Sequence, residues 1–247
     1  MKKITTAFLT IVAILFLNNN NVSAQAFQKG TINIDLGIGF GLYGTSQTQT
    51  YELNATVGGV PLSQKSTNDT TDGALSTVVP ISFEYGVTDK IGIGADFTYN
   101  NYFINDSDRV SLSSVKAFDY GLKGYYHPLN SDFYDLSVGL GFGLTSIKWT
   151  YEAVAIAPGI SNTPEPSKGS GFYVNLDIKN KFWFSEHIGA YLNIGYKGNF
   201  YSSINRDTSA EEADLESNPF VSNVSIKDEF TFTMHGANIG IGLAVKF

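Results

Sequence analysis

The chain has 247 residues, no cysteine and a formal net charge of −7. The lack of cysteine excludes a disulfide framework and a cysteine-anchored lipoprotein, and the lack of a basic patch argues against a nucleic-acid partner. The mean hydropathy is −0.04, which excludes a bundle of membrane helices. A membrane β-barrel is compatible with that value, because its outward apolar and inward polar residues cancel in the average.

The N-terminus has the pattern of a secretory signal peptide. Lys2 and Lys3 precede an apolar run over Ile4–Leu17, and the small residues of Val22–Ala24 follow. The run is shorter than the roughly 20 residues of a membrane-spanning helix, the alternative interpretation. We therefore expect residues 1–24 to be a signal peptide cleaved after Ala24, and residues 25–247 to form one domain.

Eight later segments alternate apolar and polar residues with period 2, each long enough for the roughly 9–11 residues of a tilted membrane strand. The first seven are Thr31–Gly44, Ala74–Val87, Ile91–Ile104, Val115–Tyr126, Phe133–Lys148, Gly171–Phe184 and Ile188–Ser202. Pro80 falls inside the second, so a bulge or irregular hydrogen bonding is expected there. The pattern predicts an all-β fold: an eight-stranded antiparallel up-and-down transmembrane β-barrel.

The eighth segment changes phase. Phe230, Phe232 and Met234 alternate in one phase, and the apolar residues from Ile239 to Val245 alternate in the other. A bulge near Gly236 would reconcile the two halves. Otherwise the first half is an extracellular extension whose inward face is apolar.

The connections between these segments alternate between short and long. The short ones are Thr88–Lys90, His127–Asp132 and Ser185–His187, and the long polar ones are Thr45–Gly73, Asn105–Ser114, Trp149–Ser170 and Ser203–Glu229. Short periplasmic turns and long external loops are the layout of outer-membrane barrels. A soluble eight-stranded barrel would place its apolar residues inside, whereas here glycine and charged residues share the inward face.

The last strand ends on an aromatic residue, Phe247. With the signal peptide and the alternation of turns and loops, this ending makes the chain resemble the small bacterial outer-membrane β-barrel family of the OmpX, OmpW and OmpA-transmembrane-domain type. The resemblance implies location in the bacterial outer membrane, and it implies that Phe247 is an assembly signal read by the barrel-assembly machinery. It also implies contact with outer-membrane lipid and lipopolysaccharide, and a monomer without cofactor or metal.

The strand phases point eleven charged residues into the lumen: Asp35, Glu84, Asp96, Asp119, Lys123, Asp135, Asp177, Lys179, Lys181, Lys197 and Lys246. An eight-stranded barrel is just wide enough for side chains to fill it, and buried charges must be paired or hydrated. A salt-bridge network that fixes the barrel is therefore favoured over a narrow channel for small solutes. Inward glycines such as Gly37 and Gly139 leave a narrow hydrated slot as the alternative.

A lipid A-modifying enzyme is the third class considered. It would need His, Ser and an acid at the outer rim. His127 and His187 fall in expected periplasmic turns, which leaves His235, whose phase is ambiguous and which has no recognisable partners. Acidic residues of the last long loop could bind a bridging cation, although a solvated loop face is the simpler interpretation. The expected function is a non-enzymatic structural or surface-interaction role through long extracellular loops.

Overall fold

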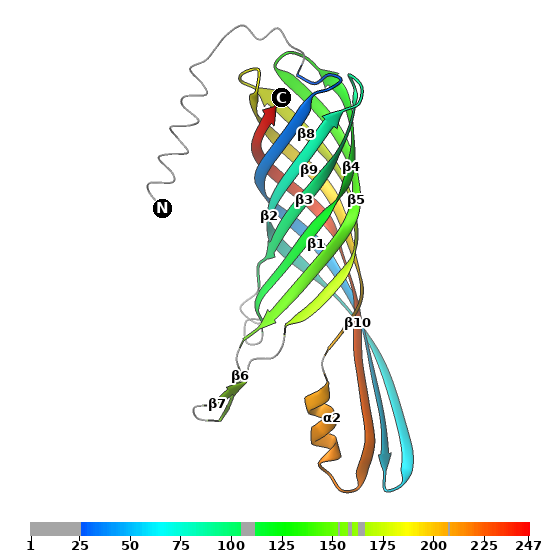
Figure 1. Ribbon diagram of the computed structural model, residues 1–247. Coiled ribbons are helices and arrows are strands. Elements are labelled where there is room, and N and C mark those ends of the chain that lie inside the picture. The colour runs from blue at the N-terminus through cyan, green and yellow to red at the C-terminus, as the bar shows by residue number, and fades with distance from the viewer. Residues whose placement is uncertain (1–25, 105–111, 153, 158–159, 163–165, 207) are drawn as a thin grey trace.

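The structure is a computed structural model that describes residues 26–104, 112–152, 154–157, 160–162, 166–206 and 208–247. Its strands close into a barrel in the order β1-β10-β9-β8-β5-β4-β3-β2, each antiparallel to both neighbours (Figure 1). This confirms the predicted fold class. The predicted signal peptide and its cleavage site lie outside the described residues.

The eight barrel strands are longer than the sequence pattern predicted. They are β1 (Ile32–Val57), β2 (Val60–Gly86), β3 (Ile91–Tyr102), β4 (Leu112–Asn130), β5 (Tyr134–Tyr151), β8 (Ser167–Trp183), β9 (Ile188–Asn205) and β10 (Val221–Lys246). A separate two-stranded sheet of β6 (Val154–Ala157) and β7 (Ile160–Asn162) and a helix, α2 (Ser209–Glu216), lie within two of the long connections.

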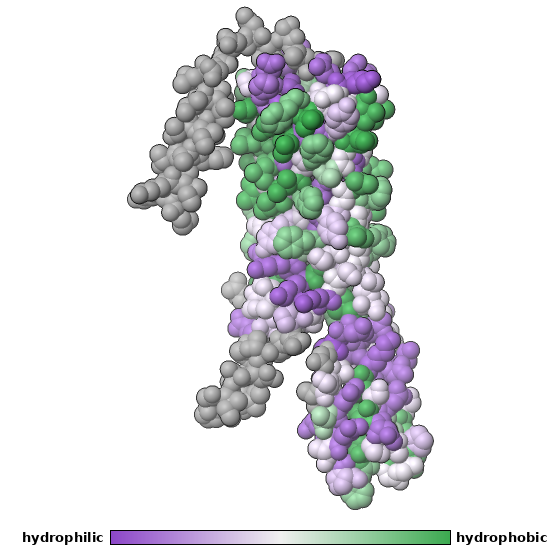
Figure 2. Space-filling model, in the orientation of Figure 1, coloured by the Kyte–Doolittle hydropathy of each residue, from purple (hydrophilic) through white to green (hydrophobic). Residues whose placement is uncertain are grey.

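Apolar side chains cover the outside of the barrel. Leu36, Phe142 and Ile241 are each more than half exposed, while the residues between outward positions face the lumen. On the face seen in Figure 2, hydrophobic residues form a green band over the half of the barrel nearer the C-terminus, and we call the apolar outer surface the apolar belt. Water would disfavour so large an apolar surface, so the belt is suited to lipid.

The first long connection is not a loop, which corrects the expectation for Thr45–Gly73. β1 and β2 continue through it as a hairpin and turn at Gly58 and Gly59, whose φ angles are 59° and 84°. Two positive φ values are those of a type I′ turn, which glycine adopts without strain. The hairpin escaped detection because serine, threonine and asparagine on both of its faces leave no apolar alternation.

β10 pairs with β1 along the whole hairpin, and α2 packs beside β10. We call this part, residues 45–73 and 208–233, the extension. Figure 1 shows it projecting from the barrel end opposite the C-terminus. The β1–β10 register continues past Gly236 without a shift, so the bulge considered there is absent. The alternative is correct: the extension's inward face carries apolar residues.

Pro80 does not shift the register between β1 and β2. Pairing stops after Leu36 with Ile81 and resumes at Gly39 with Val78, which leaves an irregular stretch opposite the proline.

The short turns lie at the barrel end that holds the C-terminus, as predicted, except that β4 runs on to Asn130 (Figure 1). Within the described part of the chain, no helix has the length and apolar character to cross a membrane.

Candidate functional site in the barrel lumen

All eleven charged residues assigned to the lumen by phase are buried. They come from all eight barrel strands, each of which contributes at least one of them through the same inward alternation. The structure brings most of them together in ion pairs and hydrogen bonds that cross the lumen. Two of these groups, and an apolar cluster above them, fill successive levels of the barrel.

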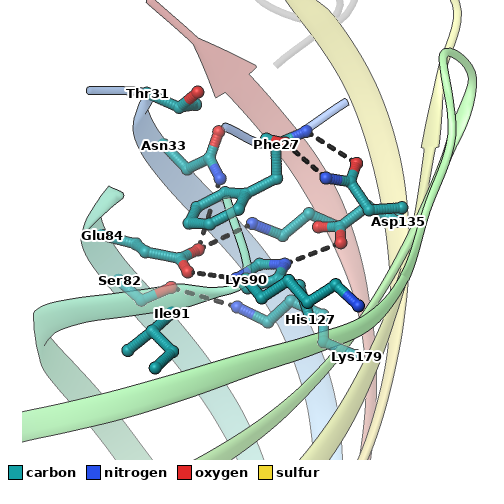
Figure 3. Close-up of polar contacts among 12 residues, drawn as sticks. Phe27, Thr31, Asn33, Ser82, Glu84, Lys90, Ile91, His127, Asp135 and Lys179 are labelled. Carbon is teal, nitrogen blue, oxygen red and sulfur yellow. Dashed lines mark hydrogen bonds and ion pairs between the residues drawn. The ribbon is translucent and has the colours of Figure 1, made fainter. Parts of the chain in front are cut away.

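The first group lies at the barrel end with the short turns, which the sequence predicts to be periplasmic and which we call the periplasmic end. We call this group the ionic layer. It comprises Asp35, Glu84, His127, Asp135, Lys179 and Lys181. Figure 3 labels Glu84, His127, Asp135 and Lys179 of this group. Lys181 Nζ lies 3.2 Å from Asp35 Oδ2 and 3.4 Å from Glu84 Oε2. Lys179 Nζ lies 2.5 Å from Asp35 Oδ2 and donates to the Ser82 hydroxyl at 3.1 Å. Lys181 and Glu84 stand on strands four places apart in the ring, so their pair ties opposite walls.

His127 completes the ionic layer and corrects its assignment to a periplasmic turn. Its Nδ1 lies 2.7 Å from Asp135 Oδ1 and its Nε2 lies 2.6 Å from Glu84 Oε1. Because each ring nitrogen faces a carboxylate, both act as donors and the ring is an imidazolium. The layer then holds three carboxylates and three cations. His127 continues the inward phase of Lys123, so the alternation of β4 extends past Tyr126, where the predicted strand ends.

The N-terminal segment closes the periplasmic mouth over this layer. Ala26 and Phe27 are fully buried, and the Phe27 ring stacks on His127 with centroids 3.6 Å apart and planes 7° apart (Figure 3). The Phe27 N–H donates to Asn130 Oδ1 at 2.9 Å, and Asn130 Nδ2 donates to the Phe27 carbonyl. We call Ala26 and Phe27 the stopper. The sequence does not predict it, because a single turn of chain has no periodicity.

The second group occupies the middle of the lumen. Lys123 Nζ lies 2.7 Å from Asp177 Oδ2, and the Tyr173 hydroxyl donates to Asp96 at 2.9 Å. Further out, Asp119 accepts hydrogen bonds from Lys197, Asn100, Thr145 and Asn199. The cavity between these groups measures about 60 Å³, room for about four water molecules.

Tyrosines fill the space that the inward glycines vacate. A Cβ added to Gly37 or Gly242 would collide with Tyr191, and one added to Gly121 or Gly143 would collide with Tyr173. The glycines therefore make room for inward rings from neighbouring strands. The hydrated slot that they suggested is largely occupied.

An apolar cluster closes the extracellular mouth, and we call it the apolar plug. Its buried members are Tyr43, Tyr102, Ala117, Ile147, Tyr201, Ile204 and Met234. Trp149 packs edge-on against Phe230 and Phe232, with centroids 5.8 and 5.7 Å apart, and all three rest on the plug. The aromatic residues that broke the phase of the last strand are thus part of this closure.

The remaining predicted residues lie at the periplasmic rim. Lys246 is buried with its Nζ 4.8 Å from the centroid of the Trp183 ring. Phe247 exchanges two backbone hydrogen bonds with Ile32, at 2.9 and 3.0 Å, and its ring points outward, two-thirds exposed. The last residue therefore closes the β1–β10 seam by its backbone while its side chain stays available.

The three histidines lie in different surroundings. His187 Nδ1 lies 2.9 Å from the Lys246 carbonyl. His235 is on the outer surface, 2.7 Å from the Tyr196 hydroxyl.

Acidic side chains do not gather into a metal site in the described ranges, where no group of three His, Cys, Asp or Glu side chains could hold a metal ion. The acids of α2 have structural partners: Glu211 pairs with Arg206, and Glu212 accepts from the Ile226 N–H at 2.7 Å.

Several solved structures are similar to this chain. The outer membrane protein OprG from Pseudomonas aeruginosa is 18% identical over 90% of this chain and 97% of its own, with a TM-score of 0.46. Ail of Yersinia pestis is 12% identical over 89% and 99%, with a TM-score of 0.38. Neisserial surface protein A is 12% identical over 77% and 95%, with a TM-score of 0.36. No protein-family model and no curated protein matches the chain.

At these identities and TM-scores, nothing about ligand or activity follows from the likeness. The identification rests on the molecule itself. A closed ring leaves no unpaired strand edge in lipid, the apolar belt faces outward, and short turns alternate with long connections. These are the properties of bacterial outer-membrane barrels, and the chain is an integral β-barrel protein of the bacterial outer membrane.

Proposed function

We propose that this barrel is a closed, non-enzymatic scaffold that displays the extension at the cell surface for interaction with other molecules. The main observation behind this proposal is that side chains fill the lumen at two levels. The ionic layer and the apolar plug lie at different levels, and the cavity between them measures only about 60 Å³. A narrow channel for small solutes, the competing function, would require both closures to open.

The extension has the surface expected of an interaction element. Its outer strand edge, over residues 60–73 of β2, is exposed throughout. Its tip presents Val57, Val60, Leu62 and Phe220, of which Phe220 is 73% exposed. The Gly58 N–H donates to the Phe220 carbonyl at 2.8 Å, which joins the hairpin turn to the chain that follows α2. An apolar tip on a polar stalk is suited to contact with a partner outside the membrane.

Two measurements test this function. Single-channel recording of the refolded protein in planar bilayers should show no steady conductance, and a large, stable conductance would favour the channel instead. Because the chain lacks cysteine, a Val60→Cys variant should react with a membrane-impermeant maleimide on intact cells. A Thr88→Cys variant, in a periplasmic turn, should react only after the outer membrane is permeabilised. The reverse pattern would refute surface display.

A further inference from the structure

Three lysines stand side by side on the outside of the barrel. In the strand register, Lys116 of β4 is opposite Lys148 of β5, and Lys148 is opposite Lys168 of β8. All three side chains are exposed. Neighbouring strands are about 4.8 Å apart, so the three Cα atoms lie within about 10 Å of one another. We call this set the lysine row.

The lysine row lies just beyond the extracellular edge of the apolar belt. On β5 the outward positions run from Phe142 and Leu144 to Ser146 and then Lys148, so the apolar side chains end two outward positions before the lysine. The four-residue step from Leu144 to Lys148 along a tilted strand rises about 10 Å along the barrel axis. That distance places the ammonium groups at the level of lipid headgroups. In Figure 2 hydrophilic residues gather beyond the belt on the side of the extension.

Nothing in the described chain neutralises the lysine row. None of the three lysines has an ion pair with a described residue, although Lys65 and Lys227 of the extension and Arg206 just before it all do. The outward positions beside the row carry Ser146 and Ser170, which bear no charge. Like charges directly opposite each other destabilise a sheet. Three lysines directly opposite one another are therefore best explained by an anionic ligand that binds between them.

We infer that the lysine row binds the phosphate groups of the outer-leaflet glycolipid, the lipid A portion of lipopolysaccharide. This inference rests on the proposed extracellular display of the extension, because that orientation places the row in the outer leaflet. Lysine is a good point-charge ligand for phosphate. The hydroxyls of Ser146 and Ser170 can donate to phosphate oxygens, and the apolar belt directly below accommodates the acyl chains of the same molecule.

The test compares two triple variants that lose the same charge. K116Q/K148Q/K168Q removes the row, and K29Q/K65Q/K90Q removes three exposed lysines elsewhere. Each protein is refolded in detergent, its fold is checked by the heat-dependent shift in gel mobility, and its affinity for diphosphoryl lipid A is measured. The row variant should bind at least about tenfold more weakly than the unmodified protein, and the control should be nearly unchanged.

Two further ligands identify the source of the recognised phosphate. Dephosphorylated lipid A should bind the unmodified protein about as weakly as diphosphoryl lipid A binds the row variant. Inorganic phosphate should compete only weakly. Equal losses in the two variants, undiminished binding of dephosphorylated lipid A, or phosphate binding as tight as lipid A binding would each overturn the inference. Maleimide labelling at Val60→Cys decides the orientation separately, so failure of the lysine row and failure of surface display are distinguishable.

Discussion

Lys181 is the residue whose removal best tests the ionic layer. It is fully buried and lies between Asp35 and Glu84, at 3.2 and 3.4 Å. In a Lys181→Met variant the layer keeps three carboxylates and only two cations, Lys179 and His127. Removing one partner of a buried ion pair costs about 3–5 kcal/mol, mostly because the other charge stays buried. Since Asp35 and Glu84 each retain a partner, we expect a loss of about 3 kcal/mol in the free energy of unfolding.

The assay is urea unfolding in lipid vesicles, followed by tryptophan fluorescence. A Lys181→Met/Glu84→Gln variant restores the charge balance and keeps an acceptor for His127, so it should be more stable than Lys181→Met alone. Lys90→Met, which alters an exposed lysine at the same barrel end, should change stability by less than about 0.5 kcal/mol. The charge argument fails if Lys181→Met costs under about 1 kcal/mol, or if the added Glu84→Gln substitution destabilises further.

Three other predictions concern the ends of the chain. Phe27→Ala should lower the free energy of unfolding by about 3 kcal/mol, and a loss under about 1 kcal/mol would show that packing of the Phe27 ring does not stabilise this end of the barrel. Deleting Phe247 should reduce the amount of folded barrel in outer membranes, and an unchanged yield would count against its role as an assembly signal. Mass spectrometry of the mature protein should find Gln25 as the first residue, whereas a chain retaining residues before Ala24 would contradict the predicted cleavage.

Strand phase predicted which charges enter the lumen but not which of them meet. Alternation depends only on the side of the sheet to which a residue belongs, so Lys181 and Glu84 could both be assigned inward from sequence. Their pairing depends on the stagger of the strands around the ring. β8 and β2 are four places apart in that ring, and no local spacing in the sequence reports on a contact across it.

The features that sequence reasoning missed lack apolar alternation. The β1–β2 hairpin of the extension is polar on both faces, so its sequence predicts a loop, whereas in the structure the two strands pair and turn at Gly58 and Gly59. His127 lies directly after Tyr126, where the predicted strand ends, although β4 continues to Asn130 with a register shift between Tyr126 and Leu129. In both cases, pairing with neighbouring strands overrides the local signal.

The last prediction follows from the separation of the two closures. Conduction needs a continuous aqueous path, and the ionic layer and the apolar plug block the lumen at different levels through different residues. Lys181→Met alone should therefore stay non-conducting in planar bilayers, because Tyr43, Tyr102 and Met234 still close the outer mouth. Tyr102→Ala/Met234→Ala alone should stay closed as well, since the ion pairs across the periplasmic end persist. Conductance should require at least that both sets are combined, and a steady current through either variant alone would show that the lumen has a single gate.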